Sequence, residues 1–315
     1  MKRLFSLLTM ILLFLPACHN QTVEPMLRVG TNQWPGYELF YLAKHLGKYN
    51  AREVRLVELP SATEVMQLLR SGRIDAAALT LDEVLSAVEQ GVDIKIVLGV
   101  DFSNGADVLL TKPEISSIND LKGKKVAVEA TAVGAILLNG ALDSSNLKLS
   151  DLQIIPTTVN HHYHTFTSGK VDAVVTFEPV RTKLLSVGAH QLFSSKDIPK
   201  QIVDVLVIRR DAMRSSPRAV QQLIDGYFSA LSYLEKNPDD AVQLMAPRLG
   251  VSPKAMLVSY DTLEMLDRDD NNKLFAAESA EFKSLTERIG YIMTKHQLLQ
   301  HKVQINNLFA ADFMQ

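Results

Sequence analysis

The sequence has one cysteine, one tryptophan and almost no net charge. A single thiol excludes an intramolecular disulfide and any metal site built from several cysteines. Because 33 Lys and Arg oppose 35 Asp and Glu, the net charge of -2 gives no electrostatic footprint for nucleic acid. With 47% hydrophobic residues the chain is typical of a folded protein. Its 315 residues exceed what one hydrophobic core usually serves, which predicts two lobes.

The N-terminal segment, residues 1–17, is typical of a secretory signal peptide. Two basic residues precede an apolar run at 4–15, which is too short to cross a bilayer as a helix, and no longer run follows. Cys18 stands directly after Leu-Pro-Ala and resembles the acylated cysteine of a bacterial lipobox, which implies a lipid anchor. The alternative is an ordinary cleavage site that leaves a free thiol. Residues 18–26 then form a polar tether.

Strand and helix patterns alternate along the rest of the chain. Short apolar runs that predict strands, each followed by apolar residues at helical spacing, lie at 27–30, 54–59, 76–79 and 125–129. This alternation predicts an α/β fold with parallel sheets covered by helices. Helical spacing also recurs at 219–234 and 280–299, so we expect a helical C-terminal third.

An internal repeat predicts two similarly built lobes. Residues 71–77 and 168–174 share a frame of Ser, Gly, a basic residue, an aliphatic residue, Asp and Ala, 97 residues apart. Each copy lies ten residues after a Ser or Thr that can open a helix, and its Gly can end that helix in a left-handed conformation. We expect residues 27–110 plus 205–315 to form the first lobe and 111–204 the second.

Four motifs resemble one family of binding proteins. They are Val29-Gly-Thr-Asn-Gln-Trp-Pro-Gly-Tyr37, the first repeat copy at 71–76, Leu121-Lys-Gly-Lys-Lys-Val-Ala-Val128 and Val171-Asp-Ala-Val-Val-Thr-Phe-Glu-Pro179. In this order they resemble the nitrate, sulfonate, taurine and thiamine-pyrimidine-precursor group of ABC-transporter solute-binding proteins. The resemblance implies a type II periplasmic-binding fold, in which two lobes, each a mostly parallel sheet flanked by helices, close a small ligand in the cleft between them. It implies no particular ligand.

Candidate ligand-binding residues of the first lobe follow the predicted strands. In open α/β sheets the ligand lies beyond the carboxyl ends of the strands, so polar and aromatic side chains were sought there. They are Asn32, Trp34, Tyr37, Thr63 and Thr80. Trp34 stands in a loop beside Pro and Gly and can stack on a flat ligand or cap a cation. The alternative is that it packs against its own lobe.

The second lobe and its junction add Asp107, Thr131, Val133 and Glu178 as ligand-binding candidates. Asp107 lies near the predicted crossover, where a turn without ligand contact is an equal alternative. The backbone N–H groups at Thr131 and Val133 begin a helix and can hold an anion, although Thr131 can also simply cap that helix. Glu178, before a proline, is expected to bind an amine or ring N–H, with a helix-dipole role as the alternative.

The predicted cleft is acidic. No arginine is predicted there, whereas Asp82, Asp107, Glu129 and Glu178 are acidic candidates. This balance favours a ligand with a cationic or donor-rich part over a bare anion such as nitrate. Sulfonates, taurine-like amines and aminopyrimidines all remain open.

Two patterns suggest metal sites without completing them. His161 and His164 would share one helix face and could ligate zinc, but no third ligand is identifiable. Residues 267–278 have the spacing of a calcium loop, although Asn272 replaces the glycine of its sharp turn. A solvated helix face and a plain polar loop are the alternatives, and we expect neither metal nor cofactor.

These observations favour a binding protein over an enzyme. No nucleophile elbow, phosphate loop or paired catalytic carboxylates are present. Thiamine-precursor synthases resemble this fold but carry a cysteine-rich motif that this chain lacks. We expect a monomeric, lipid-anchored, extracytoplasmic protein that captures a small polar organic solute for an ABC permease and its ATPase. The alternative is a ligand-sensing partner of a membrane-bound signalling receptor.

Overall fold

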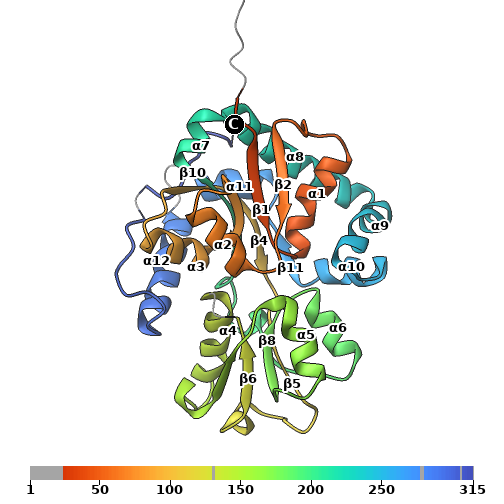
Figure 1. Cartoon of the computed structure of the whole chain (residues 1–315), viewed down its shortest axis with the longest axis vertical. Helices are drawn as coiled ribbons and strands as arrows, with labels where there is room; N and C mark the ends of the chain where they lie inside the picture. The colour runs from red at the N-terminus through yellow and green to blue at the C-terminus, as the bar shows by residue number, and fades with distance from the viewer. Residues whose placement is uncertain (1–23, 130–131, 277–279, 306, 315) are drawn as a thin grey trace, which may run out of the picture.

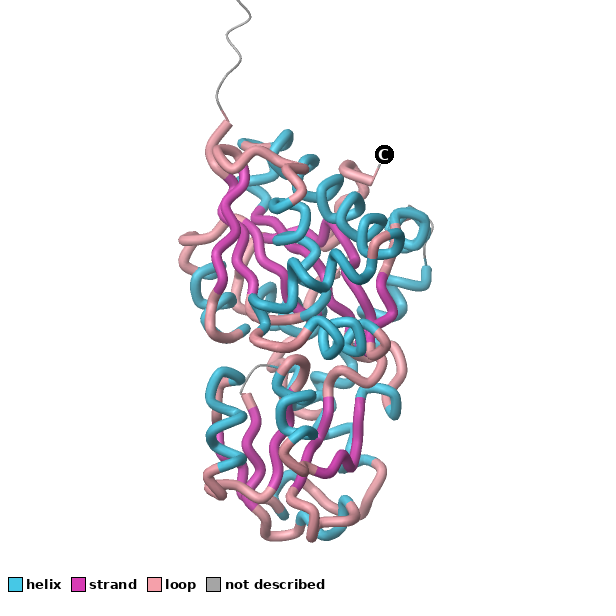
Figure 2. Tube along the Cα trace, turned by 90° about the vertical axis from the view of Figure 1, so that its right-hand side faces the viewer, coloured by secondary structure: helices cyan, strands magenta, loops and turns pink. Residues whose placement is uncertain are grey.

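The structure is a computed structural model that describes residues 24–129, 132–276, 280–305 and 307–314. Two lobes lie one above the other along the longest axis, each built on one sheet (Figure 1). The turned view shows a waist between them that loops cross (Figure 2). None of the described helices is long and apolar enough to span a membrane. The predicted leader, Cys18 and Thr131 fall outside the described residues.

The larger lobe has a six-stranded sheet in the order β11-β4-β10-β3-β1-β2. Its strands are β1 (Leu27–Thr31), β2 (Val54–Glu58), β3 (Ala76–Thr80), β4 (Ile94–Ser103), β10 (Val203–Arg209) and β11 (Leu263–Met265). Because β1 pairs in parallel with β2 and β3, and β10 runs antiparallel to both β3 and β4, strands β1 to β4 share one direction. Their carboxyl ends all point toward the other lobe.

Helices cover both faces of this sheet. They are α1 (Glu38–His45), α2 (Ala62–Arg70), α3 (Leu81–Glu89), α7 (Arg210–Ser215), α8 (Pro217–Lys236), α9 (Pro238–Leu249), α10 (Pro253–Tyr260), α11 (Arg268–Phe275) and α12 (Ala280–Lys295), with the 3-10 helix η1 (Pro35–Tyr37). Strands β3 and β4 are buried along their whole length, which explains their near-continuous apolar sequences. The predicted helical C-terminal third is confirmed apart from the short strand β11.

The smaller lobe has a five-stranded sheet in the order β7-β6-β8-β5-β9. Its strands are β5 (Val108–Thr111), β6 (Lys125–Val128), β7 (Gln153–Pro156), β8 (Ala173–Thr176) and β9 (His190–Ser194). Its helices are α4 (Ala132–Asp143), α5 (Val159–Thr167) and α6 (Val180–Ser186), with the 3-10 turns η2 (Ile118–Leu121), η3 (Leu149–Asp151) and η4 (Ser195–Asp197). The two sheets share one topology. In the order β7-β6-β8-β5-β9 of the smaller lobe and the order β2-β1-β3-β10-β4 within the larger lobe, the fourth strand is antiparallel to its neighbours.

The sequence repeat marks equivalent positions in the two lobes. Gly72 and Gly169 have positive φ angles of 68° and 74°, as a left-handed helix end requires. Each precedes the middle strand of its sheet, β3 or β8. Ser61 caps α2 by accepting a hydrogen bond from the Glu64 N–H, whereas Thr158 begins α5 without a side-chain cap. The repeat therefore reports a shared helix–turn–strand unit.

The lobe boundaries lie a few residues from the predicted ones. β5 belongs to the smaller sheet, so the predicted boundary at residue 110 cuts a strand. β10 belongs to the larger sheet and begins before the predicted return at residue 205. The crossovers are residues 104–107 and 195–202. Polar residues at 103–107 and 195–201 mark both breaks in the sequence, but they do not tell to which sheet the strand on either side belongs.

The two crossovers are tied to one another. Ser103 Oγ and Ser195 Oγ lie 2.8 Å apart, and Ser195 Oγ also accepts the Gly105 N–H at 2.6 Å. The Ser103 N–H donates to the Ile202 carbonyl at 3.1 Å. Gly105 has a φ of 112°, a conformation that side-chain-bearing residues rarely adopt. We refer to residues 103–107 and 195–204 together as the hinge.

In the part of the chain that the structure describes, neither the histidine pair nor the calcium-loop pattern forms a cluster of metal ligands. Asp267 caps the N-terminus of α11 by accepting the Asp270 N–H at 2.8 Å, so residues 268–275 are helical instead of looping around an ion. His161 and His164 are exposed, while the histidine between them, His162, is buried against Thr176 and the Thr157 carbonyl. No group of three or more potential metal ligands is found among the described residues.

Candidate functional site

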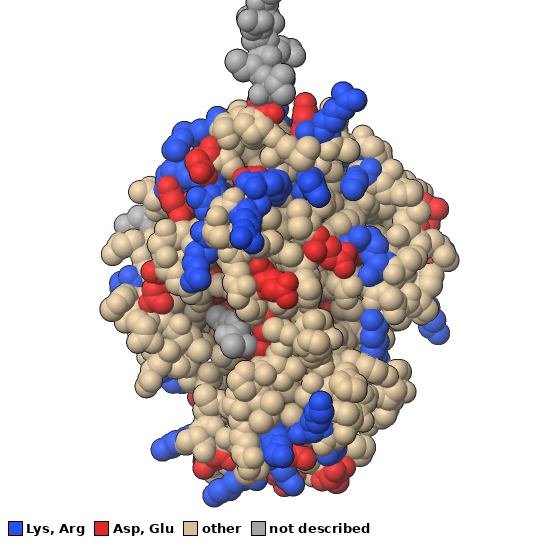
Figure 3. Space-filling model, viewed as in Figure 1, with Lys and Arg blue, Asp and Glu red and all other residues tan. Residues whose placement is uncertain are grey.

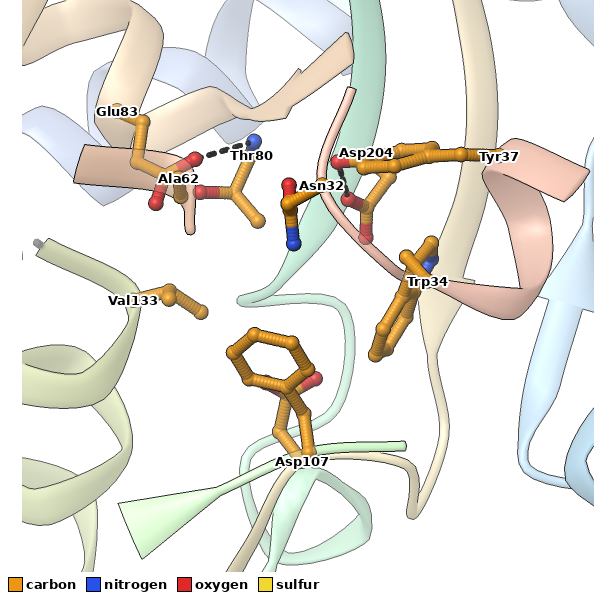
Figure 4. Close-up of a pocket in the computed structure, with 10 residues that line it drawn as sticks. Asn32, Trp34, Tyr37, Ala62, Thr80, Glu83, Asp107, Val133 and Asp204 are labelled. Carbon is orange, nitrogen blue, oxygen red and sulfur yellow. Dashed lines mark hydrogen bonds between the residues drawn. The ribbon is translucent and has the colours of Figure 1, made fainter. Parts of the chain in front are cut away.

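A small pocket lies between the lobes, where the carboxyl ends of both sets of parallel strands meet. Its lining residues are Asn32, Trp34, Tyr37, Ala62, Thr80, Glu83, Asp107, Val133, Phe177 and Asp204. In Figure 4, Thr80 and Glu83 lie on one side of the space, Trp34 and Asp204 on the other, and Asn32 between them. Val133 and Asp107 approach from the smaller lobe, so residues from both lobes enclose the space.

Aromatic rings form one wall of the pocket and link the lobes. The Trp34 and Phe177 rings meet edge to face with centroids 5.7 Å apart. The Trp34 indole N–H donates to Asp101 Oδ2 at 3.0 Å, which fixes the ring. A Cβ on Gly36 would overlap that same carboxylate, which explains the glycine in the turn. Trp34 therefore packs within its own lobe and also faces the pocket.

Buried carboxyl groups surround the pocket, and several of their oxygens have no hydrogen-bond partner. The unpartnered buried atoms are Thr80 Oγ1, both Asp82 oxygens, Glu83 Oε1, Asp101 Oδ1, Asp107 Oδ2 and Asp204 Oδ2. Among the described lining residues there is no Lys, Arg or His. Burial of an unpaired charge costs several kcal/mol, so these groups must bind protons or a cationic ligand. We call Asp82, Glu83, Asp101, Asp107 and Asp204 the acidic cluster.

Burial and mutual repulsion hold protons on this cluster near neutral pH. Burial raises the pKa of Asp82, Asp101 and Asp107 to about 7 each. Burial and the nearby Asp82 charge raise the pKa of Glu83 to about 8. The pKa of Asp204 is raised well above its usual value by burial and by the nearby Asp101 charge. Strongly shifted carboxyl groups in a cleft are typical of binding and catalytic sites.

Tyrosine and threonine groups hold the cluster in place. The Tyr37 hydroxyl donates to Asp204 Oδ1, and burial raises the pKa of Tyr37 well above its usual value, so it remains a donor. The Thr80 N–H donates to Glu83 Oε2 at 3.1 Å, which leaves Oε1 of that carboxyl free. One oxygen of Glu83 and one of Asp204 are thus fixed, and the other is available to a ligand.

Glu129 connects the two lobes beside the pocket. Its Oε1 accepts the Thr63 N–H at 3.1 Å and the Thr63 hydroxyl at 2.7 Å, at the start of α2 in the larger lobe. Its Oε2 accepts the Val159 N–H at 2.9 Å, at the start of α5 in the smaller lobe. A carboxylate at two helix N-termini is favourable for both. Glu129 therefore fastens the lobes in this closed arrangement.

Two further bonds join the lobes on the flanks of the cleft. Lys183 Nζ donates to the Leu249 carbonyl at 2.9 Å, and Lys295 Nζ pairs with Asp143 Oδ2 at 2.8 Å. Both involve at least one partly exposed side chain, so we expect them to contribute less than the buried Glu129 bonds.

Replacement of Glu129 by Ala is expected to speed the release of bound ligand about 10-fold to 100-fold. The expected net loss is that of about one hydrogen bond to a buried charge, about 1.5–3 kcal/mol, because water replaces much of the three lost bonds when the lobes open. The measurement is stopped-flow dissociation followed by Trp34 fluorescence. Lys295→Ala, which removes an exposed interlobe pair, is the matched control and should change the rate less than 3-fold. Equal rates for Glu129→Ala and wild type would show that these bonds do not hold the closed state.

Most predicted ligand-binding residues are brought together, and some are not. Asn32, Trp34, Tyr37, Thr80, Asp107 and Val133 line the pocket. Thr63 instead bonds Glu129 at the pocket edge. Thr131 lies outside the described residues.

Glu178 is buried but turned toward its own lobe. Its Oε1 accepts from Arg181 at 2.9 Å and from the Thr182 hydroxyl at 2.8 Å, and its Oε2 accepts the Thr182 N–H at 3.2 Å. An arginine thus lies close to this part of the cleft, where the sequence predicted none. With its charge paired inside the smaller lobe, Glu178 is not among the lining residues.

Sequence reasoning missed Glu83, Phe177 and Asp204. Glu83 neighbours the named Asp82, and only the phase of α3 decides which of the two lines the pocket. Phe177 lies one residue before the chosen Glu178. Asp204 lies inside β10, which is antiparallel to its neighbours, whereas ligand-binding residues were expected only after parallel strands. A charged residue within the otherwise apolar run Val203–Ile208 was the available signal.

The fold and pocket define a class: a two-lobed α/β protein of the type II periplasmic-binding fold, with a pocket between the lobes. The alkanesulfonate-binding protein of Xanthomonas axonopodis pv. citri bound to MOPS superposes with a TM-score of 0.78 at 20% identity, over 91% of this chain and 98% of that one. The periplasmic aliphatic sulphonate-binding protein of Escherichia coli gives 0.72 at 22% identity, over 91% and 97%. A desulfurization enzyme also has this fold, with a TM-score of 0.65 at 17% identity, over 91% and 97%. The predicted fold class is confirmed.

The model of the NMT1-like family matches residues 21–250, so the chain belongs to that family. A putative aliphatic sulfonates-binding protein of Escherichia coli is 23% identical over 261 residues, 82% of this chain and 79% of the relative. A putative thiamine biosynthesis protein of Haemophilus influenzae is 24% identical over 314 residues, 96% and 98% of the two chains. The resemblance to the sulfonate and thiamine-precursor binding group is thus confirmed.

Proposed function

We propose that this protein is an extracytoplasmic solute-binding lipoprotein that captures a small organic cation, or a solute rich in hydrogen-bond donors, for an ABC importer. The observation that carries the proposal is that three members of the acidic cluster, Glu83, Asp107 and Asp204, line the interlobe pocket. Each of the three has one buried oxygen without a hydrogen-bond partner, and no cation is among the described lining residues. Its partners would be a membrane permease and a cytoplasmic ATPase. Cys18 would carry the lipid anchor after removal of residues 1–17, and the protein would act as a monomer.

Charge narrows the classes that the sequence left open. A sulfonate or nitrate would bind only while these carboxyl groups keep their protons, because no described lining residue would neutralise its charge beside an ionised carboxylate. A protonated amine or an aminopyrimidine would instead supply donors to Glu83, Asp107 and Asp204, and its ring could pack on Trp34. These two classes fit the pocket better than simple sulfonates, although sulfonate-binding relatives share the fold.

Two other functions are less well supported. None of the relatives described above supports a role as a ligand-sensing partner of a signalling receptor. An enzymatic role has a precedent in the fold, yet the described lining residues include no cysteine, serine or histidine, and no group of metal ligands is found among the described residues. Capture and release explains the closed lobes and the hinge without a chemical step.

The test is thermal unfolding of the mature chain with taurine, alkanesulfonates, nitrate, aminopyrimidines and polyamines. A true ligand at about 100 times its Kd stabilises by about 2.7 kcal/mol, or several degrees. We expect aminopyrimidines or amines to raise the unfolding temperature and nitrate and alkanesulfonates to leave it unchanged. Stabilisation by an alkanesulfonate alone would overturn the assignment of a cationic ligand.

A further inference from the structure

The end of the larger lobe that lies opposite the pocket carries exposed arginines. The amino ends of β1 to β4, the carboxyl end of β10 and the carboxyl ends of α1 and α2 all meet there, because the helices return antiparallel to the strands. Five exposed arginines lie at or next to these ends of the strands and helices. They are Arg52, Arg55, Arg70, Arg73 and Arg214. We call this surface the basic end. Figure 3 shows Lys and Arg gathered over the upper part of the larger lobe.

These five arginines remain available for a partner. Other arginines nearby are neutralised, since Arg28 pairs with Asp75 at 2.7 Å and Arg210 with Asp93 at 2.8 Å. The five arginines themselves form no ion pair with any described acidic residue. The acidic cluster lies at the opposite, pocket side of the lobe, away from these arginines.

The described chain begins at this same end. Glu24 pairs with Arg218 at 2.9 Å, and the Pro25 carbonyl accepts the Ser216 hydroxyl at 2.9 Å, both at the start of α8. Figure 1 shows the chain entering the larger lobe beside α7 and α8, away from the smaller lobe. Five residues separate Cys18 from Glu24, so the distance between the two is at most about 20 Å. An anchor on Cys18 would hold the basic end within about two Debye lengths of the bilayer.

We propose that the basic end docks on an anionic phospholipid surface while the anchored protein collects solute, and that it leaves the lipid when the pocket side turns to the permease. This inference rests on the proposed function only for the lipid anchor that brings the protein to the membrane. Binding of the basic end to lipid does not require the anchor. Basic side chains near an anionic leaflet contribute about 1 kcal/mol each, and a lipid chain with a basic patch is more stable than either alone.

The experiment uses the mature chain from residue 18 with Cys18→Ser, which keeps both lobes and removes the acylation site. Co-sedimentation with vesicles of equal phosphatidylglycerol and phosphatidylcholine is measured at low salt. Arg70→Glu, Arg73→Glu and Arg214→Glu combined should lower the partition coefficient at least 10-fold. The matched control reverses Lys122, Lys148 and Lys170 to Glu, three exposed lysines at the far end of the smaller lobe, and should change it less than 2-fold.

Each outcome decides the inference. Binding that disappears with pure phosphatidylcholine or at 0.5 M salt supports it. No binding to the anionic vesicles, or equal losses in the two triple variants, would overturn it. Displacement by inorganic phosphate, but not by sodium chloride of equal ionic strength, would also overturn it by revealing an anion pocket. The thermal shift with aminopyrimidines or amines, and the mass of acylated Cys18 in the native protein, test the proposed function separately.

Discussion

Asp107→Asn is expected to weaken binding of the stabilising amine or aminopyrimidine at least about 100-fold, and to raise the unfolding temperature of the ligand-free protein. Loss of one partner of a buried charged pair costs about 2–5 kcal/mol, which gives the size of the affinity loss. The gain in stability has the same source. Asp107 Oδ2 is buried without a partner, and an amide carries no charge to desolvate.

The measurements are isothermal titration calorimetry and thermal unfolding of the same samples at pH 7.5. Asp269→Asn, an exposed carboxylate on α11, is the control and should change neither quantity. Weaker ligand binding together with a higher unfolding temperature would show that Asp107 serves binding at a cost to the stability of the ligand-free protein. If Asp107→Asn binds as tightly as wild type, Asp107 makes no ligand contact and its only role is in the hinge turn.

The ligand-free protein is expected to lose stability as the pH rises from about 5 to 8. Unfolded Asp and Glu titrate near pH 4, whereas Asp82, Asp101 and Asp107 titrate near 7 and Glu83 near 8 in the folded chain. Between these values the folded state binds more protons, so stability falls with pH. One group with a folded pKa of about 7 loses about 2.7 kcal/mol over this range.

His162 acts in the opposite sense and only at lower pH. Burial lowers its pKa to about 4, so stability that depends on its neutral ring is lost as the pH falls from about 6.5 to 4. Between about pH 5 and 6.5, the stability gained by His162 offsets the stability lost by one carboxyl group. The net expectation is an unfolding temperature at least about 5 °C lower at pH 8 than at pH 5.

Differential scanning calorimetry across pH 5 to 8 measures this fall. A bound amine or aminopyrimidine should flatten the curve, because a cation replaces the protons, and its apparent affinity should rise with pH over the same range. Asp107→Asn should have a shallower slope than wild type. A flat or rising curve for the ligand-free protein would mean that the cluster is already ionised and is stabilised in some other way.

The sequence predicted the architecture well, because the fold depends on signals that repeat. Gly72 and Gly169 each end a helix in the left-handed conformation before the middle strand of a sheet, and both copies were visible in the sequence. The rule that ligands lie after parallel strands also located much of the pocket, including Asn32, Trp34 and Thr80.

What the sequence could not supply was side-chain direction and long-range pairing. Asp82 and Glu83 are adjacent, and their different roles follow from helix phase within a tertiary contact. Glu178 was a reasonable candidate until Arg181, one helical turn later, proved to pair with it. The bond between Glu129 and Thr63 joins residues 66 positions apart, and nothing local encodes it.

The hinge and the acidic cluster share residues. Asp101 lies two residues before Ser103, Asp107 ends the first crossover, and Asp204 follows the second, while Ser103 and Ser195 join the two crossovers. A ligand that contacts Asp107 and Asp204 therefore acts at the hinge between the lobes and not at their outer ends. Since each lobe is a long arm on that hinge, a small shift of these carboxylates produces a much larger displacement at the outer surfaces. The charge of the bound solute is thereby converted into a change of shape that a partner could recognise from outside.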